Sequence, residues 1–262
     1  MRKKITVLSI AVLLILSLSN YIIFAEGIFD LSHKDNGKIR INYDIADGKY
    51  KVMVEKDDTK YFYDLQGEAD FLLQMGSGDY TVSILKNIEK NKHIFQEMID
   101  FSVKLENERL PFLQSAVPVI WDKSTETVKF TAELTDKLKS DEEKAKAVYT
   151  YIIKNISYDY EKIKKLGTDY MPDADQILEE GRGICYDYAV LYASMLRSIG
   201  IPTKLVKGYK NDIDGYHAWN EVYISEKGWV IVDTTYDSIY LENGTSINPV
   251  KNIKDYNKVR EY

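Results

Sequence analysis

Residues 181–202 read Gly-Arg-Gly-Ile-Cys-Tyr-Asp-Tyr-Ala-Val-Leu-Tyr-Ala-Ser-Met-Leu-Arg-Ser-Ile-Gly-Ile-Pro and hold the only cysteine of the chain. After Cys185 no Gly or Pro occurs until Gly200, and Pro202 follows. A Gly just past the last turn, with a Pro soon after, is typical of a helix end. The stretch therefore predicts a helix that begins at Cys185. The apolar stripe of this helix includes the cysteine and continues through Ala189, Tyr192, Leu196 and Ile199.

The predicted helix places the Cys185 thiol in its first turn. There the free backbone N–H groups and the positive end of the helix dipole favour thiolate over thiol. Two preceding glycines permit a close approach of the backbone, and Asp187 stands where a core helix does not need a carboxylate. A lone cysteine on an apolar helix face is nevertheless more often a small buried hydrophobe. Catalysis requires a base and an orienting acid from elsewhere in the chain.

Length and composition restrict the class of protein. A chain of 262 residues forms one large or two modest domains, and 45% hydrophobic residues can build a packed core. The formal net charge of -6 argues against nucleic acid as a partner. A single cysteine excludes an internal disulfide.

Residues 1–25 have the pattern of an export signal. Arg2, Lys3 and Lys4 precede an apolar run, and Ala25 supplies a small residue for cleavage. The alternative is an uncleaved membrane anchor. Both interpretations predict an extracytoplasmic protein, secreted or at the cell surface, with no membrane span beyond this segment.

The remaining sequence suggests two domains joined by a connection. Residues 26–110 are predicted to form a small β-sandwich, because short Ile-, Val- and Tyr-rich runs alternate with turn residues; these runs are 38–45, 49–55, 60–65, 79–85 and 94–105. Residues 111–123, which include Pro111, Pro118 and Trp121, are predicted to be a linker.

Residues 124–262 are predicted to form an α+β domain, because helical patterns are followed by strands. The expected helices are 124–139, 141–155 (begun by a capping box of Ser140 and Glu143) and 174–180, with the Cys185 helix after them. The expected antiparallel strands are 203–209, 217–224 and 227–233. The tail from 234 to 262 has no pattern that assigns a structure.

Two of these strands carry the missing catalytic residue types. His217 begins the strand His-Ala-Trp-Asn-Glu-Val-Tyr-Ile, and Asp233 ends the apolar strand that follows it through a short turn. An acid at that end can accept the imidazole N–H and fix its tautomer. The two rivals of Asp233 are Asp237, in a segment expected to bend away, and Glu221, which lies too far along the strand.

These three segments resemble the transglutaminase-like superfamily, whose core is similar to papain-type cysteine proteases. The matching motifs are Gly-x-Cys-x-Asp-Tyr-Ala with Leu-Arg-x-x-Gly-Ile-Pro, then His-Ala-Trp-x-Glu-Val, then Gly-Trp-x-x-x-Asp, and they span about residues 124–240. Thr234 stands where many members have Pro. The resemblance implies Cys185 as nucleophile, His217 as base and then acid, and Asp233 as orienter. It also implies a thioester intermediate formed from an amide.

We therefore expect an exported cysteine enzyme that acts on amide bonds of proteins or peptides, with cell-wall peptides as one candidate. Hydrolysis is favoured over cross-linking because water is always present. The alternative is a catalytically silent module for adhesion or assembly. No cofactor and no catalytic metal are expected, since one cysteine and three histidines cannot build a zinc site. The side-chain oxyanion donor is left open between Tyr158 and Gln176.

Overall fold

The computed structural model describes residues 27–45, 48–90, 92–167 and 169–262. The predicted export signal, residues 1–25, lies outside the described residues. The chain divides into two compact units, Met1–Glu106 and Asn107–Tyr262. Within the described ranges, no helix combines the length and the apolar character needed to cross a membrane.

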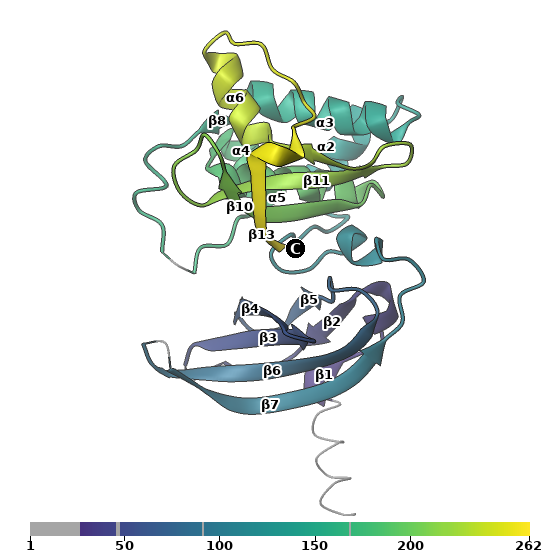
Figure 1. The fold of residues 1–262 in the computed structure, drawn as a ribbon, viewed down its shortest axis with the longest axis vertical. Coiled ribbons are helices and arrows are strands. Elements are labelled where there is room, and N and C mark those ends of the chain that lie inside the picture. The colour runs from purple at the N-terminus through teal and green to yellow at the C-terminus, as the bar shows by residue number, and fades with distance from the viewer. Residues whose placement is uncertain (1–26, 46–47, 91, 168) are drawn as a thin grey trace, which may run out of the picture. The chain divides into compact units, whose positions relative to one another are not determined.

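The first unit consists of two antiparallel β-sheets. One contains β1 (Phe29–Asp30), β2 (Lys38–Ile41) and β5 (Ala69–Leu72), in that order. The other has the order β4 (Thr59–Leu65), β3 (Tyr50–Lys56), β6 (Gly78–Glu89) and β7 (Lys92–Val103) (Figure 1). The sheets share a core, in which the rings of Tyr63 and Phe71 lie 5.3 Å apart. The expectation of a small all-β sandwich is confirmed, although β5 had no alternating pattern and was not predicted.

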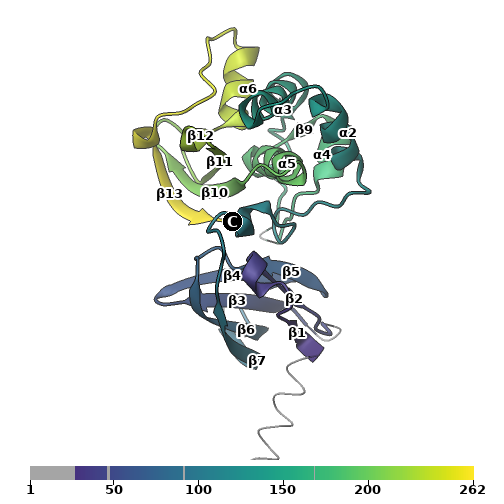
Figure 2. The same ribbon diagram turned by 90° about the vertical axis from the view of Figure 1, so that its right-hand side faces the viewer.

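The second unit packs helices against an antiparallel sheet, as expected for an α+β domain. Its helices are α2 (Glu126–Thr135), α3 (Asp141–Asn155), α4 (Ala174–Glu180), α5 (Cys185–Ser198) and α6 (Thr234–Glu242). The sheet has the order β12 (Gly228–Val232), β11 (His217–Ile224), β10 (Thr203–Lys210) and β13 (Tyr256–Glu261). A short parallel pair joins β8 (Ser157–Tyr158) to β9 (Arg182–Gly183). Figure 2 shows α5 between the other helices and the sheet.

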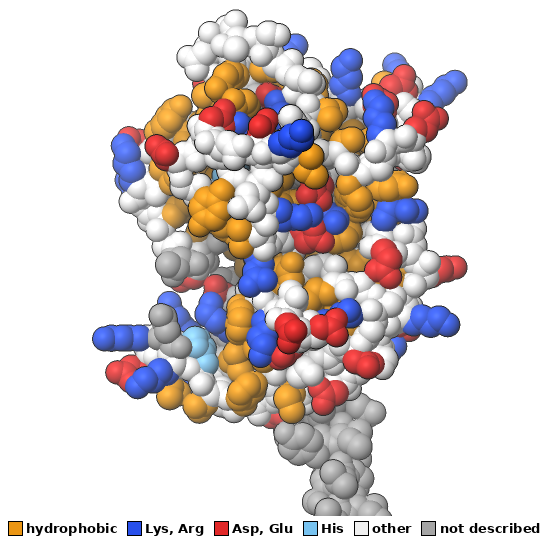
Figure 3. Space-filling model, in the orientation of Figure 1, with side chains coloured by type: hydrophobic (Ala, Val, Ile, Leu, Met, Phe, Trp, Pro, Cys, Tyr) orange, Lys and Arg blue, Asp and Glu red, His pale blue; other side chains and the backbone are white. Residues whose placement is uncertain are grey.

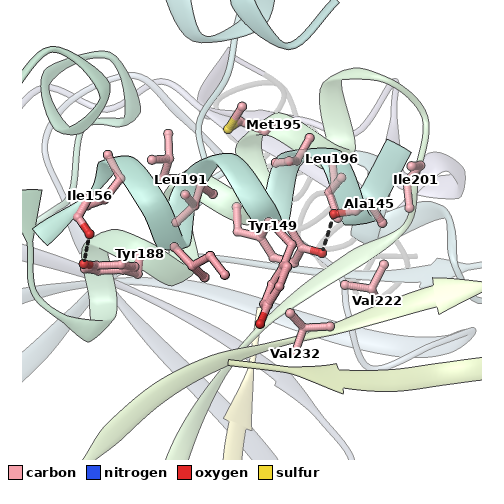
Figure 4. Close-up of a cluster of buried hydrophobic side chains, with 14 of the residues drawn as sticks. Ala145, Tyr149, Ile156, Tyr188, Leu191, Met195, Leu196, Ile201, Val222 and Val232 are labelled. Carbon is pink, nitrogen blue, oxygen red and sulfur yellow. Dashed lines mark hydrogen bonds between the residues drawn. The ribbon is translucent and has the colours of Figure 1, made fainter. Parts of the chain in front are cut away.

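Helix α5 forms the centre of the second unit. Its residues from Asp187 to Arg197 are all buried, so it is surrounded on every side rather than along one stripe. On one side it meets α3 in an apolar cluster (Figure 4), where the Tyr192 hydroxyl donates to the carbonyl of Ala145 over 3.2 Å. The predicted capping box of Ser140 and Glu143 is present at the start of α3.

Residues 111–123, predicted as a linker, pack into the second unit instead. Phe112 lies in a 3-10 helix, Leu110–Leu113, and its ring meets Trp229 at 5.5 Å. Val119 is fully buried against α5, β10 and β11. Arg197 of α5 donates to the carbonyl of Gln114 over 3.1 Å. The boundary between the two units therefore falls at residue 106. The apolar residues of 111–123 belong to the core of the second unit.

The tail, unassigned from the sequence, completes this unit. It contains α6, a 3-10 helix (Ile253–Asp255) and β13, which pairs antiparallel with β10. The two strands approach closely at Gly208. A Cβ added there would lie 2.1 Å from the carbonyl oxygen of Asn257 and 2.8 Å from the Trp219 ring, so only glycine fits.

The face of the molecule shown in Figure 3 carries both signs of charge. Lys and Arg side chains are interspersed with Asp and Glu, and neither kind forms a continuous patch on this face. Hydrophobic side chains lie between them on this face. On the edge strand β7, Phe95 is 65% exposed.

Candidate active site

Cys185 is the first residue of α5, and its helix start is fixed by a buried carboxylate. Asp187 accepts the backbone N–H of Ile184 at 2.9 Å. It also accepts the Tyr170 hydroxyl at 2.5 Å and pairs with Lys162 at 2.7 Å, so it ties the loop before α4 to the helix start. A Cβ on Gly183 would lie 2.6 Å from the Asp187 Cβ. The carboxylate of Asp187, unexpected in a core helix, therefore fixes the backbone next to the Cys185 thiol.

His217 lies at the start of β11, opposite Gly208 of β10. Its Nε2 is 2.8 Å from Oδ2 of Asp233, and the imidazole also forms a hydrogen bond with the Cys185 thiol. Burial of the ring lowers its pKa, but the charge and hydrogen bond of Asp233, with smaller contributions from Cys185, raise the pKa of His217 to about 10. The structure thus brings together the three residues that the sequence analysis named. In this geometry the imidazole is held as a cation next to the sulfur of Cys185.

Asp233 is fully buried and held by three donors. It follows β12 directly and is the N-cap of α6, where its Oδ1 accepts the backbone N–H of Tyr236 at 3.0 Å. Its Oδ2 accepts both His217 and the Tyr256 hydroxyl, the latter at 2.9 Å. Burial and the charge of Asp233 raise the pKa of Tyr256, so this hydroxyl remains a donor. The carboxylate is fixed by strand, helix and tail together.

Neither rival carboxylate reaches the imidazole. Asp237 accepts the Tyr149 hydroxyl at 2.7 Å and pairs with Lys251. Glu221 pairs with Lys258 at 3.0 Å. Both are engaged with other partners, so the geometry favours Asp233 as the orienting group.

Two supporting residues were missed in the sequence. Tyr256 comes from the tail, where no local pattern marks it, and its ring packs on Trp219 at 5.0 Å. Asn220 donates to the carbonyl of Ala189 at 2.9 Å and to that of Lys204 at 3.1 Å, which ties α5 to the sheet. Alternation could have identified Asn220, because it lies on the same face of β11 as the buried Ala218 and so puts an amide in the core.

The structure separates the two candidate oxyanion donors. Tyr158 pairs with Gly183, two residues before Cys185, and its hydroxyl forms no hydrogen bond with the residues described. Burial first, and then the neighbouring Cys185, raise the pKa of Tyr158 to about 12, so its hydroxyl stays protonated. Gln176 instead donates to Glu180 on the surface of α4 at 2.7 Å. The Cys185 backbone N–H, at the first helical position, has no partner in the helix. The hydroxyl and this N–H are the donors that the site offers.

In residues 27–45, 48–90, 92–167 and 169–262, no three His, Cys, Asp or Glu side chains gather in a group that could hold a metal ion.

Comparison with known proteins places this site in a family context. Residues 128–234 match the model of the transglutaminase-like superfamily. Kyphoscoliosis peptidase of Mus musculus is 31% identical over 126 residues, which cover 44% of this chain and 19% of that protein. Protein-glutamine gamma-glutamyltransferase of Pseudomonas aeruginosa is 36% identical over 74 residues, or 24% of this chain and 11% of that protein. The chain thus spans less than a fifth of the length of these relatives.

Solved structures with a similar chain path include the periplasmic domain of TgpA from Pseudomonas aeruginosa. It is 16% identical, with a TM-score of 0.42, over 76% of this chain and 90% of that one. Red sea bream transglutaminase is 13% identical, with a TM-score of 0.34, over 76% of this chain and 48% of that one.

Proposed function

Because residues 128–234 of this chain belong to the transglutaminase-like superfamily, we propose that it is a cysteine-dependent acyl-transfer enzyme acting on amide bonds of proteins or peptides. One observation carries the proposal: His217 lies between the thiol at the start of α5 and the buried carboxylate of Asp233. A nucleophile, a base and a group that orients the base are the parts that covalent acyl transfer requires.

In the first half-reaction the sulfur of Cys185, whose proton His217 now carries, attacks the carbonyl carbon of the amide. The oxyanion that forms accepts hydrogen bonds from the Cys185 backbone N–H and the Tyr158 hydroxyl. The C–N bond then breaks, the imidazolium of His217 gives its proton to the leaving amine, and a thioester remains on the enzyme.

In the second half-reaction neutral His217 takes a proton from the incoming nucleophile. With water, this yields a carboxylic acid and free thiol; with an amine, it yields a new amide. We favour water because it is always present. The relatives' names include both a peptidase and a glutamyltransferase, which supports acyl transfer from an amide without choosing between the two.

The place of action follows from the sequence of residues 1–25. Its basic start, apolar run and small residue are typical of export, so we propose an extracytoplasmic enzyme. Its substrates are then proteins or peptides outside the cytoplasm, and cell-wall peptides are one such class.

Alkylation of the thiol tests this proposal without a known substrate. Iodoacetamide should modify Cys185 quickly near neutral pH in the wild type and far more slowly in His217→Ala, as measured by mass spectrometry. Cys185→Ser identifies the modified site, and His33→Ala is the matched control for the loss of a histidine outside this unit. Circular dichroism checks that each variant is folded. Equally slow labelling of wild type and His217→Ala would contradict the proposal and favour a silent binding module.

A further inference from the structure

Lys207 is a lysine beside the candidate nucleophile that the proposed mechanism does not use. It lies on β10 opposite Ala218, next to the pair formed by Gly208 and His217. Its ammonium lies 3.4 Å from the centroid of the Tyr186 ring, which follows Cys185 in the chain. A second ring, that of Tyr262, is 5.5 Å away. The side chain therefore points toward the start of α5.

The ammonium of Lys207 differs from the other shielded ammonium groups of this unit. Lys204 pairs with Glu261 at 3.0 Å, and Lys210 and Lys251 pair with Asp212 and Asp237. For Lys207, no carboxylate in the described part of the chain forms an ion pair with it. A half-buried cation is normally paired, because removing it from water is costly. The aromatic rings compensate only in part.

The charge balance of the site leaves room for an anion. Burial lowers the pKa of Lys207 to about 8, and the nearby Cys185 acts in the opposite direction. The thiol already has His217 as its hydrogen-bond partner. A negative group brought by the substrate would pair with this ammonium, for which the described residues supply rings and no carboxylate.

We propose that Lys207 binds a carboxylate of the substrate next to the amide that Cys185 attacks, so that the substrates are peptides with an acidic side chain or a free carboxylate at that position. This inference rests on the proposed function. The ammonium acts as a point charge beside the reacting carbonyl, where it holds the acidic group and orients the amide. Stabilisation of the Cys185 thiolate by Lys207 is the competing explanation, which the experiment must separate.

Two pairs of alkylating reagents test the inference, since the members of each pair differ only in a carboxylate against an amide. They are iodoacetate with iodoacetamide, and chloroacetyl-alanine with chloroacetyl-alanine amide. The measured quantity is the ratio of the two Cys185 modification rates within one protein at pH 6.5. In Lys207→Met the ratio of the carboxylate reagent to the amide reagent should fall about tenfold, as expected for the loss of one charge-assisted hydrogen bond.

Further variants control for charge and folding. Lys207→Arg should keep most of the wild-type ratio, and Lys207→Gln should repeat the loss seen in Lys207→Met. Lys227→Met removes one charge from the turn at the far end of β11 and should leave the ratio unchanged. Equal slowing of both reagents in Lys207→Met would mean that Lys207 stabilises the Cys185 thiolate, and it would overturn the inference. An unchanged ratio in both reagent pairs would also overturn it. A wild-type Cys185 no more reactive than free cysteine would refute the proposed function itself, and the inference with it.

Discussion

Replacing Asp233 with Asn changes one atom of the site and tests how His217 is held. The Asn oxygen can still accept the backbone N–H of Tyr236, and Asn is as good an N-cap as Asp, so α6 should remain. The amide nitrogen would then face the ring where Oδ2 now accepts it. This favours the imidazole tautomer with the proton on the wrong nitrogen.

The strength of the interaction between Asp233 and His217 follows from the raised pKa of His217. Its pKa increases from 6.5 to about 10 in the folded protein. At ~1.4 kcal/mol per pH unit, this shift corresponds to an interaction on the order of 5 kcal/mol. Without the carboxylate, burial is the largest remaining influence and lowers the pKa, so the midpoint of His217 should fall below 6.5. Turnover should drop by up to ~10⁴, the effect of the equivalent change in serine proteases.

Two measurements follow the change directly. NMR titration can resolve His217, because the chain has only 3 histidines. A pKa raised on folding stabilises the fold fully below the unfolded value and loses that contribution as pH rises through the folded value. The His217 contribution to unfolding free energy in the wild type should therefore decline between pH 6.5 and about 10. In Asp233→Asn this contribution should instead increase with pH below 6.5. The difference in unfolding free energy between the two proteins, followed against pH, therefore reports the contribution of His217.

Asp237→Asn is the matched control, since Asp237 bonds to Tyr149 and Lys251 rather than to the imidazole. It should lower stability and leave the His217 midpoint near 10. A midpoint that stays near 10 in Asp233→Asn and falls in Asp237→Asn would refute the reasoning and transfer the orienting role to Asp237.

Three further outcomes are expected. Tyr158→Phe should lower kcat on a peptide amide by about 10²–10³ with KM little changed, because an oxyanion donor is lost; Gln176→Ala should leave both constants unchanged, and the reverse result would exchange their roles. Tyr256→Phe removes a buried donor to Asp233, so urea unfolding should show a loss of about 1–3 kcal/mol, whereas Tyr209→Phe, at an exposed position, should show none. A fragment of residues 107–262 should unfold cooperatively. A fragment of residues 124–262 should be less stable by at least about 3 kcal/mol in unfolding free energy, because it lacks the buried side chains of Val119 and Phe112. Equal stability of the two fragments would show that residues 111–123 are only a linker.

The parts of the fold that were predicted correctly are those with local signals. Helix α3 was expected at its observed bounds because Ser140 and Glu143 form a capping box and the apolar face repeats at helical spacing. Helix α5 was predicted to begin at Cys185 for similar reasons. His217 and Asp233 could be paired from the sequence because a short turn joins their strands, which fixes the antiparallel register. Local rules therefore placed the candidate base and acid near each other.

Long-range pairing explains what the sequence could not supply. β13 has no clear alternation, and its position depends on β10, about 50 residues earlier in the chain. Tyr256, which donates to Asp233, could not be recognised before that pairing was known. Residues 111–123 were misread for the same reason. Val119 is a core residue only because α5 and β10 surround it.

Lys207 is different, because a local signal for it was present in the sequence. Along β10, alternation places Leu205 and Lys207 on one face and Lys204 and Val206 on the other. Leu205 packs against α5 in the core, so Lys207 had to lie on the side of α5. Lys204, on the opposite face, has Glu221 and Glu261 as counter-ions. Once the core face of β10 is known, alternation alone therefore places this cation on the side of α5. What the structure adds is that two tyrosine rings lie near this ammonium where Lys204 has carboxylates, and that difference makes it a candidate for binding substrate.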